Sequence, residues 1–152
     1  STTRPVGSGI RTLEIPDTCV LRAPIAAETT WESALRALEE LRTKHRKRTA
    51  GTESQLEEIA TFEVSGDGKP VSVILRLLTI PDKPPDGFVK EPGRRGLAVA
   101  VEGLERVDGN RIADLRRELP KGSISGRPYV RLDRKGEANR RVVLVLPFDS
   151  AR

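Results

Sequence analysis

The stretch ATFEVSGDGKPVSVILRLLTI, residues 60–80, decides the fold class of this chain. Phe62 and Val64 alternate with polar neighbours, and the turn formers of residues 66–69, Gly-Asp-Gly-Lys, follow them directly. An alternation of period two around a glycine-containing turn is typical of a β-hairpin, because successive side chains of a strand point to opposite faces. The sequence therefore predicts an antiparallel hairpin near the middle of the chain.

The second arm of this hairpin is apolar on both of its sides, apart from Ser72 and Arg76. Such a run predicts an interior strand that is covered on both faces. Residues 97–104, LAVAVEGL, predict another buried strand. Further strands are expected over residues 10–15, 18–25, 129–133 and 140–148.

A long amphipathic helix is predicted over residues 30–48. Thr29 followed by Glu32 forms a capping box, and an apolar stripe follows at helical spacing (Trp31, Ala34, Leu35, Leu38 and Leu41). A second helix is expected over residues 111–119, capped by Asp108 or Asn110 and stopped by Pro120. The acidic stretch around Leu56 and Ile59 predicts a short helix, whose carboxylates would neutralise the basic end of the long helix if the two pack together.

These elements predict a single α+β domain, in the order ββα(α)βββαββ, with no internal repeat visible in the sequence. A mostly antiparallel sheet of five to seven strands would be covered by two or three helices. We expect a disordered tail over residues 1–9, the domain over residues 10–148 and a tail over residues 149–152. Residues 81–96 hold four prolines and three glycines, so they predict an irregular loop.

Composition excludes several classes of protein. No apolar run approaches the roughly 20 residues of a membrane span, and the first residues do not form a signal peptide. A single cysteine, Cys19, and a single histidine, His45, leave no disulfide framework and no multi-cysteine or His-pair metal site. We therefore expect an intracellular protein, cytoplasmic or nuclear, or one carried within a virion.

The sequence offers little catalytic chemistry. Cys19 reads as a small buried hydrophobe, and His45 lies among cations that disfavour the imidazolium of a general base. The segment GSISG of residues 122–126 lacks a serine at its centre, so it is no nucleophile elbow, and no phosphate-binding glycine motif is present. The expectation is a protein that is not an enzyme and uses no metal or cofactor.

Charge is distributed unevenly along the chain. The 152 residues carry a net charge of +5, yet residues 111–152 alone hold 11 basic and 5 acidic side chains. This asymmetry indicates an anionic partner, nucleic acid or another polyanion. The predicted phosphate-binding set is Arg94, Arg95, Arg116, Arg117, Lys121, Arg127, Arg131 and Arg134, with a possible second basic patch at Arg42, Lys44, Arg46, Lys47 and Arg48.

The leading hypothesis from sequence is a non-catalytic protein that binds the phosphate backbone of DNA or RNA without regard to base sequence. Only five aromatic residues are present, which argues against base-stacking platforms. The alternative is a structural or assembly subunit, such as a capsid, matrix, scaffold or complex component, that forms a homo-oligomer. It would use the loop of residues 81–96, with Phe88 as a protein contact, and its exposed edge strands. Otherwise Phe88 is expected to be a hydrophobic anchor that ties this loop to the domain.

Overall fold

A computed structural model describes the chain except for residues 1–4, 7–8, 49–54, 134–140 and 151–152. It confirms the α+β class, with a single antiparallel sheet of ten strands, larger than the five to seven predicted. The strands are β1 (Pro5–Val6), β2 (Ile10–Ile15), β3 (Thr18–Pro24), β4 (Ala60–Val64), β5 (Pro70–Arg76), β6 (Val89–Glu91), β7 (Arg94–Val101), β8 (Ser123–Ser125), β9 (Tyr129–Asp133) and β10 (Arg141–Ser150). The helices are α1 (Trp31–Arg48), the 3₁₀ turn η1 (Leu104–Arg106) and α2 (Gly109–Arg117).

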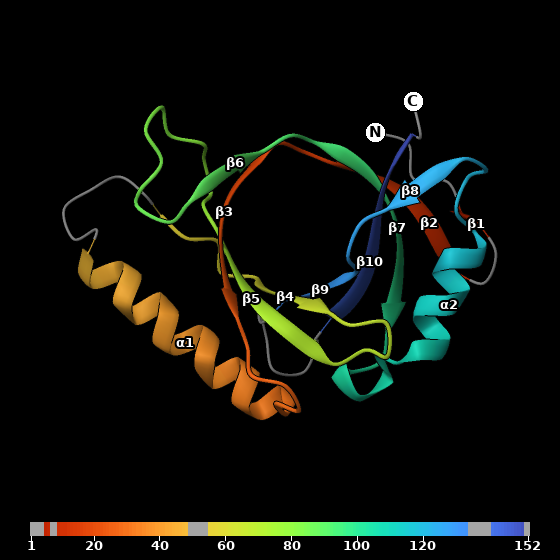
Figure 1. The fold of residues 1–152 in the computed structure, drawn as a ribbon, viewed down its shortest axis with the longest axis horizontal. Coiled ribbons are helices and arrows are strands. Elements are labelled where there is room, and N and C mark those ends of the chain that lie inside the picture. Colours follow the sequence, from red (N-terminus) through yellow and green to blue (C-terminus); the bar gives the residue numbers. More distant parts are fainter. Residues whose placement is uncertain (1–4, 7–8, 49–54, 134–140, 151–152) are drawn as a thin grey trace.

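The sheet runs in the order β1-β2-β7-β10-β9-β4-β5-β3-β6, with β8 paired to the end of β10. It is strongly curled, and both helices lie outside the curl (Figure 1). α1 packs on β5, whereas α2 packs on β10 and β7. The sheet therefore has an outer face under the helices and an inner face that looks into the curl.

Two short connections run across the opening of the curl. One joins β2 to β3 through Pro16 and Asp17, and the other joins β6 to β7 through Pro92 and Gly93. The Gly93 N–H donates to Asp17 Oδ1 at 2.5 Å, which ties the connections together. A Cβ at residue 93 would lie 2.7 Å from the Ile15 carbonyl oxygen, so this crossing requires glycine.

The topology repeats, although no repeat is visible in the sequence. β3-α1-β4-β5 and β7-α2-β9-β10 each form a βαββ unit. The units meet where β4 pairs with β9, in a register that sets Phe62 opposite Val130. β2 lies beyond β7 in one unit, and β6 lies beyond β3 in the other. The curl is thus built from two similar halves that face each other.

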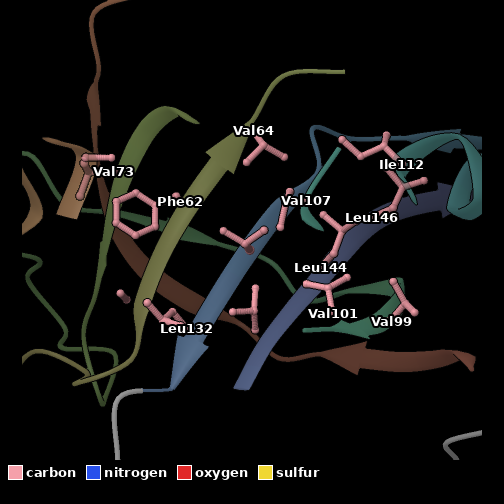
Figure 2. Close-up of a cluster of buried hydrophobic side chains, with 14 of the residues drawn as sticks. Phe62, Val64, Val73, Val99, Val101, Val107, Ile112, Leu132, Leu144 and Leu146 are labelled. Atoms are coloured by element: carbon pink, nitrogen blue, oxygen red, sulfur yellow. The ribbon is translucent and has the colours of Figure 1, made fainter. Parts of the chain in front are cut away.

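The core lies between the outer face and the helices. Figure 2 shows the side chains of β4, β9 and β10 converging there with Ile112 of α2. Phe62 is completely buried, and Trp31 of α1 packs edge-on against it with ring centroids 5.6 Å apart. Every second residue of the central strands joins this cluster, which is the period-two pattern that the sequence shows.

The two predicted helices are present with small changes at their ends. Thr30 rather than Thr29 caps α1, because its Oγ1 accepts from the Ser33 N–H at 3.1 Å while the Thr29 hydroxyl donates to the Ala26 carbonyl. Asp108 caps α2 by accepting from the Arg111 N–H at 2.9 Å. No helix in the described part of the chain is long and apolar enough to span a membrane.

Several boundaries differ from the sequence prediction. Residues 55–58 form no helix, because Leu56 instead makes a β-bridge to Leu77. The loop of residues 81–96 contains β6 and the start of β7, because their backbones pair with β3 and β2. The predicted tails are shorter, since β1 pairs with β2 and β10 continues to Ser150. Residues 1–4, 7–8 and 151–152 of those tails lie outside the described residues.

Candidate binding site inside the curled sheet

The inner face of the sheet carries charged and polar side chains at the alternate positions that the core leaves free. Thr61 and Glu63 of β4 stand beside Ser72 and Arg76 of β5, and Tyr129 and Arg131 of β9 lie across from the β4 pair. A sheet face with this many polar groups inside a curled fold is unusual, because unpaired buried polar groups are costly. We therefore take this face as the candidate site.

One side of the inner face is electrostatically balanced. Arg22 of β3 forms ion pairs with Glu63, at 3.3 Å between Nε and Oε2, and with Glu91 of β6. The Ser72 hydroxyl donates to Glu63 Oε1 at 2.5 Å. These contacts occupy both carboxylates, so this side of the face is a structural ion-pair network.

The other side is centred on Arg76 and Tyr129. Tyr129 is 9% exposed, and its hydroxyl lies within hydrogen-bonding reach of the Arg76 guanidinium. Burial raises the pKa of Tyr129, so the phenol stays protonated at neutral pH. Burial first, and then the charge of nearby Arg131, lower the pKa of Arg76 from its usual value. Two cations are therefore held close together in a poorly solvated place.

Part of this positive charge has a partner and part does not. Arg131 Nη2 donates to Glu57 Oε1 at 2.9 Å, and both side chains are about one-fifth exposed. Arg131 Nη1 and Arg76 Nε are buried, yet neither makes a hydrogen bond within the described part of the protein. A buried donor of a charged group that lacks an acceptor destabilises the folded state by roughly 3 kcal/mol, unless water or a ligand accepts from it.

A cavity of about 420 Å³ opens beside these groups. Its walls combine charged side chains with apolar side chains of β2 and β10. The charged residues are Arg11, Arg76, Arg131, Arg141, Glu14 and Glu57, the apolar ones are Leu13, Ile15, Val143 and Val145, and Pro16, Ile59 and Tyr129 complete the wall. A second, narrower cavity of about 70 Å³ shares Ile15, Arg76 and Tyr129 with the first, so these residues lie between the two. The larger volume is within the roughly 300–1,000 Å³ typical of small-molecule sites.

The structure does not gather the predicted phosphate-binding residues onto one surface. Arg94 pairs with Asp149 at 2.9 Å and lines the narrow cavity, whereas Arg95 is exposed and lies 3.6 Å from Glu14. Arg117 pairs with Asp114 on α2, which covers the outer face of the sheet.

The rest of that set is scattered as well. Arg116 of α2 donates to Ser125 Oγ at 3.4 Å, and Lys121 is exposed. Arg127 is also exposed and lines the narrow cavity with Arg94, whereas Arg131 is half-buried on the inner face. Arg134 lies outside the described residues. The excess of cations in residues 111–152 is therefore distributed between the outer side of the molecule, where α2 lies, and the inner face of the sheet.

The possible second basic patch is not one surface either. Arg42 is 7% exposed, and its Nη2 donates to the carbonyls of Glu57 and Glu58 at 3.3 and 2.9 Å. It therefore acts as a structural link between α1 and residues 55–59. Lys44 and Arg46 are exposed, and the side chains of Lys47 and Arg48 lie outside the described residues.

Phe88 is the internal anchor that the sequence favoured, and not the protein contact of the assembly alternative. It is 6% exposed, and its ring packs against His45 of α1 with centroids 5.0 Å apart. Cys19 is completely buried, and burial raises the pKa of its thiol. No three His, Cys, Asp or Glu side chains gather as a metal site in the described part of the chain.

Sequence reasoning missed Arg76, Tyr129, Glu57 and the inner face as a whole. The available signal was the spacing of Ser72 and Arg76, which are four residues apart on one face of a predicted strand. The sequence analysis treated Ser72 and Arg76 as exceptions in a strand that is apolar on both sides. In the structure they belong to the polar inner face of the sheet.

The sequence matches no known family profile and no curated protein sequence. The structure is similar to the crystal structure of the EcmrR C-terminal domain, with a TM-score of 0.62 over 93% of this chain and 97% of that one. The two sequences are 13% identical, so the likeness concerns the fold. The class that the fold and site define is an α+β domain with a curled antiparallel sheet, two outer helices and a charged cavity that opens to solvent.

Proposed function

We propose that this protein is a non-catalytic binding domain that holds a small organic molecule inside its curled sheet. The observation that carries the proposal is the cavity of about 420 Å³, whose wall combines apolar side chains with buried guanidinium N–H groups that have no partner among the described residues. Concave sites with an apolar lining and a few convergent polar groups are the usual form of small-molecule sites.

The chemistry of the wall supports binding rather than reaction. Its polar side chains are arginines, glutamates and one tyrosine, whose raised pKa keeps the phenol protonated. Cys19 and His45, the only thiol and the only imidazole in the sequence, both lie outside the cavity wall. Permanently charged arginines orient a ligand and do not exchange protons with it.

A neutral fluorescent probe tests this proposal. N-phenyl-1-naphthylamine should bind the wild-type protein saturably, with one site per chain, and its emission should rise as it leaves water. Val143→Trp fills the cavity from β10 and should weaken binding about tenfold or more, because the ring occupies the space that the ligand needs.

Ile124→Trp is the matched control. Ile124 lies on β8, is 62% exposed and does not line either cavity. It should leave the affinity unchanged, and circular dichroism should show that both variants fold. If neither neutral, anionic nor cationic naphthalene probes bind the wild type saturably, the proposal is wrong.

A second candidate function is the nucleic-acid binding that the sequence predicts. Lys121 and Arg127 favour it, because both are exposed and neither forms an ion pair with a described carboxylate. We expect fluorescence anisotropy with duplex DNA and duplex RNA to show binding that weakens linearly in log salt. The double variant Lys121→Gln, Arg127→Gln should reduce the magnitude of the slope of log K against log salt by about 2, as the loss of two phosphate contacts would. No binding at low salt would exclude this function.

The assembly alternative depends on exposed apolar side chains. Val89 on the edge strand β6 is 54% exposed, and Ile124 on β8 is more exposed still. Short edge strands with apolar side chains can pair with a second chain. Light scattering coupled to size-exclusion chromatography should detect an oligomer that Val89→Lys disrupts, and a monomer at all concentrations would contradict this alternative.

A further inference from the structure

We propose that the ligand of the larger cavity is an amphipathic organic anion: a carboxylate, sulfonate or phosphate on an apolar body. The inference rests on the proposed function and adds the chemical class of the ligand. The acidic group would accept hydrogen bonds from Arg76 and Arg131, and the apolar body would lie on β2 and β10.

The balance of charge around the cavity favours an anion. Of its two carboxylates, Glu14 lies 3.6 Å from Arg95, which is outside the cavity wall, and Glu57 is paired with Arg131. Arg11, Arg76 and Arg141 have no carboxylate within ion-pair distance among the described side chains. Glu57 lies close enough to Arg76 to offset part of the lowering of its pKa by burial, but the four arginines of the wall still outnumber its two glutamates. A cationic ligand would therefore meet an excess of positive charge, whereas an anion would reduce it.

The donors without a partner indicate where the acidic group of the ligand would bind. Arg76 Nε and Arg131 Nη1 are both buried, and both residues line the cavity. A guanidinium offers its N–H groups in one plane, a geometry that matches the two oxygens of a carboxylate or the face of a phosphate. The Tyr129 hydroxyl lies beside Arg76 and keeps its proton, so it adds a third donor at the same end of the cavity.

The wall beside these donors suits an apolar group, because Val143 and Val145 of β10 pair with Arg131 and Tyr129 of β9. Ala98, Tyr129 and Val145 form a small hydrophobic cluster on the inner face, separate from the main core, and Leu13, Ile15 and Val143 pack against it while remaining partly exposed. Five of these six residues also line the cavity, namely Leu13 and Ile15 of β2, Val143 and Val145 of β10, and Tyr129 of β9. An apolar ligand group is stabilised on such a surface, because its binding removes apolar area from water.

The same geometry separates a small anion from a nucleic acid. The donors are buried on the inner face of the sheet, where a phosphate of a continuous duplex backbone cannot follow them. Phosphate contacts of DNA-binding proteins come from exposed side chains. A small molecule that enters the cavity as a whole can reach both the guanidinium groups and the apolar wall.

A matched ligand pair tests the inference. 2-Naphthoate and 2-naphthamide have nearly the same shape and differ in charge, so isothermal titration calorimetry with both isolates the contribution of the anion. We expect the wild-type protein to bind naphthoate about tenfold or more tightly than naphthamide, as a charge-assisted hydrogen bond in a buried site would give. Arg76→Gln should weaken the binding of naphthoate more than that of naphthamide, and so reduce this preference.

Arg117→Gln is the control for net charge. It removes the same charge from an exposed side chain on α2, outside both cavities, and should not alter the preference. If Arg76→Gln fails to fold, Arg131→Gln makes the same test from the neighbouring strand. Equal affinities of the wild type for naphthoate and naphthamide would overturn the inference and leave the proposed function standing. Binding of neither would overturn the inference, and failure of a cationic naphthalene probe as well would refute the proposed function. Binding of inorganic phosphate alone with the affinity of naphthoate would refute the amphipathic ligand.

Discussion

Removal of the Glu57 carboxylate should lower the stability of the protein and raise its affinity for anions at the same time. Glu57→Gln keeps an oxygen that can accept from Arg131 Nη2, but it removes the charge that balances this arginine. Arg131 then lies near Arg76 without compensation, and like charges that are poorly solvated repel each other.

The size of the effect follows from the burial of the pair. A hydrogen bond that involves a charged partner contributes about 1.5–3 kcal/mol, whereas a neutral one contributes about 0.5–1.5 kcal/mol. Because Glu57 and Arg131 are 19% and 20% exposed, solvent screens only part of the interaction. We expect Glu57→Gln to reduce the free energy of unfolding by about 1–2 kcal/mol.

Urea denaturation at pH 7, with and without 2-naphthoate, measures both effects. A ligand at one hundred times its Kd adds about 2.7 kcal/mol of stability, so naphthoate should restore what the substitution removes. The exposed pair of Arg117 and Asp114 supplies the control, since Asp114→Asn should change stability by less than about 0.5 kcal/mol. Unchanged stability of Glu57→Gln, or weaker binding of naphthoate by it, would refute this description of the site.

Three further predictions concern the scaffold. Phe62→Ala should lower the free energy of unfolding by about 3–5 kcal/mol in urea, because this ring is completely buried at the centre of the core; a loss below about 1 kcal/mol would contradict its central position. Asp108→Ala should cost about 1 kcal/mol by the same measurement, since it removes the N-cap of α2, and Asp108→Asn should retain most of that stability. Burial, and then the charge of Arg46, lower the pKa of His45, so folding favours the neutral imidazole and stability should fall as the pH drops below about 6.5, the value of the unfolded chain. Thermal melts between pH 5 and 8 should show this loss in the wild type and less of it in His45→Phe; equal pH dependence of the two proteins would count against the assignment.

The sequence predicted the two helices and the central hairpin close to where the structure has them. The hairpin of β4 and β5 and the two amphipathic helices form near the predicted positions, because each depends on neighbours close in sequence. Sheet size was underestimated, because β1, β6 and β8 are two or three residues long and exist only through pairing with distant strands. Residues 55–58 were predicted as a helix, but the bridge between Leu56 and Leu77 holds them extended.

The candidate site was the hardest part to foresee. The sequence shows an excess of arginine in residues 111–152, and this predicted an anionic partner on an outer surface. Arg131 belongs to the predicted set, yet it reaches the cavity only because β9 lies beside β4. Its companions Arg76 and Glu57 lie more than fifty residues away in the chain, so no local pattern joins them.

The sequence by itself determined the class of fold, since period-two and helical patterns are local and record which side of each element leaves water. It also determined that cations outnumber anions in the last third of the chain. Only the tertiary structure decided which cations are exposed, which are paired and which are buried around a cavity. That decision depends on how far the sheet curls and on which strands become neighbours, and both follow from long-range pairing that no short stretch of sequence encodes.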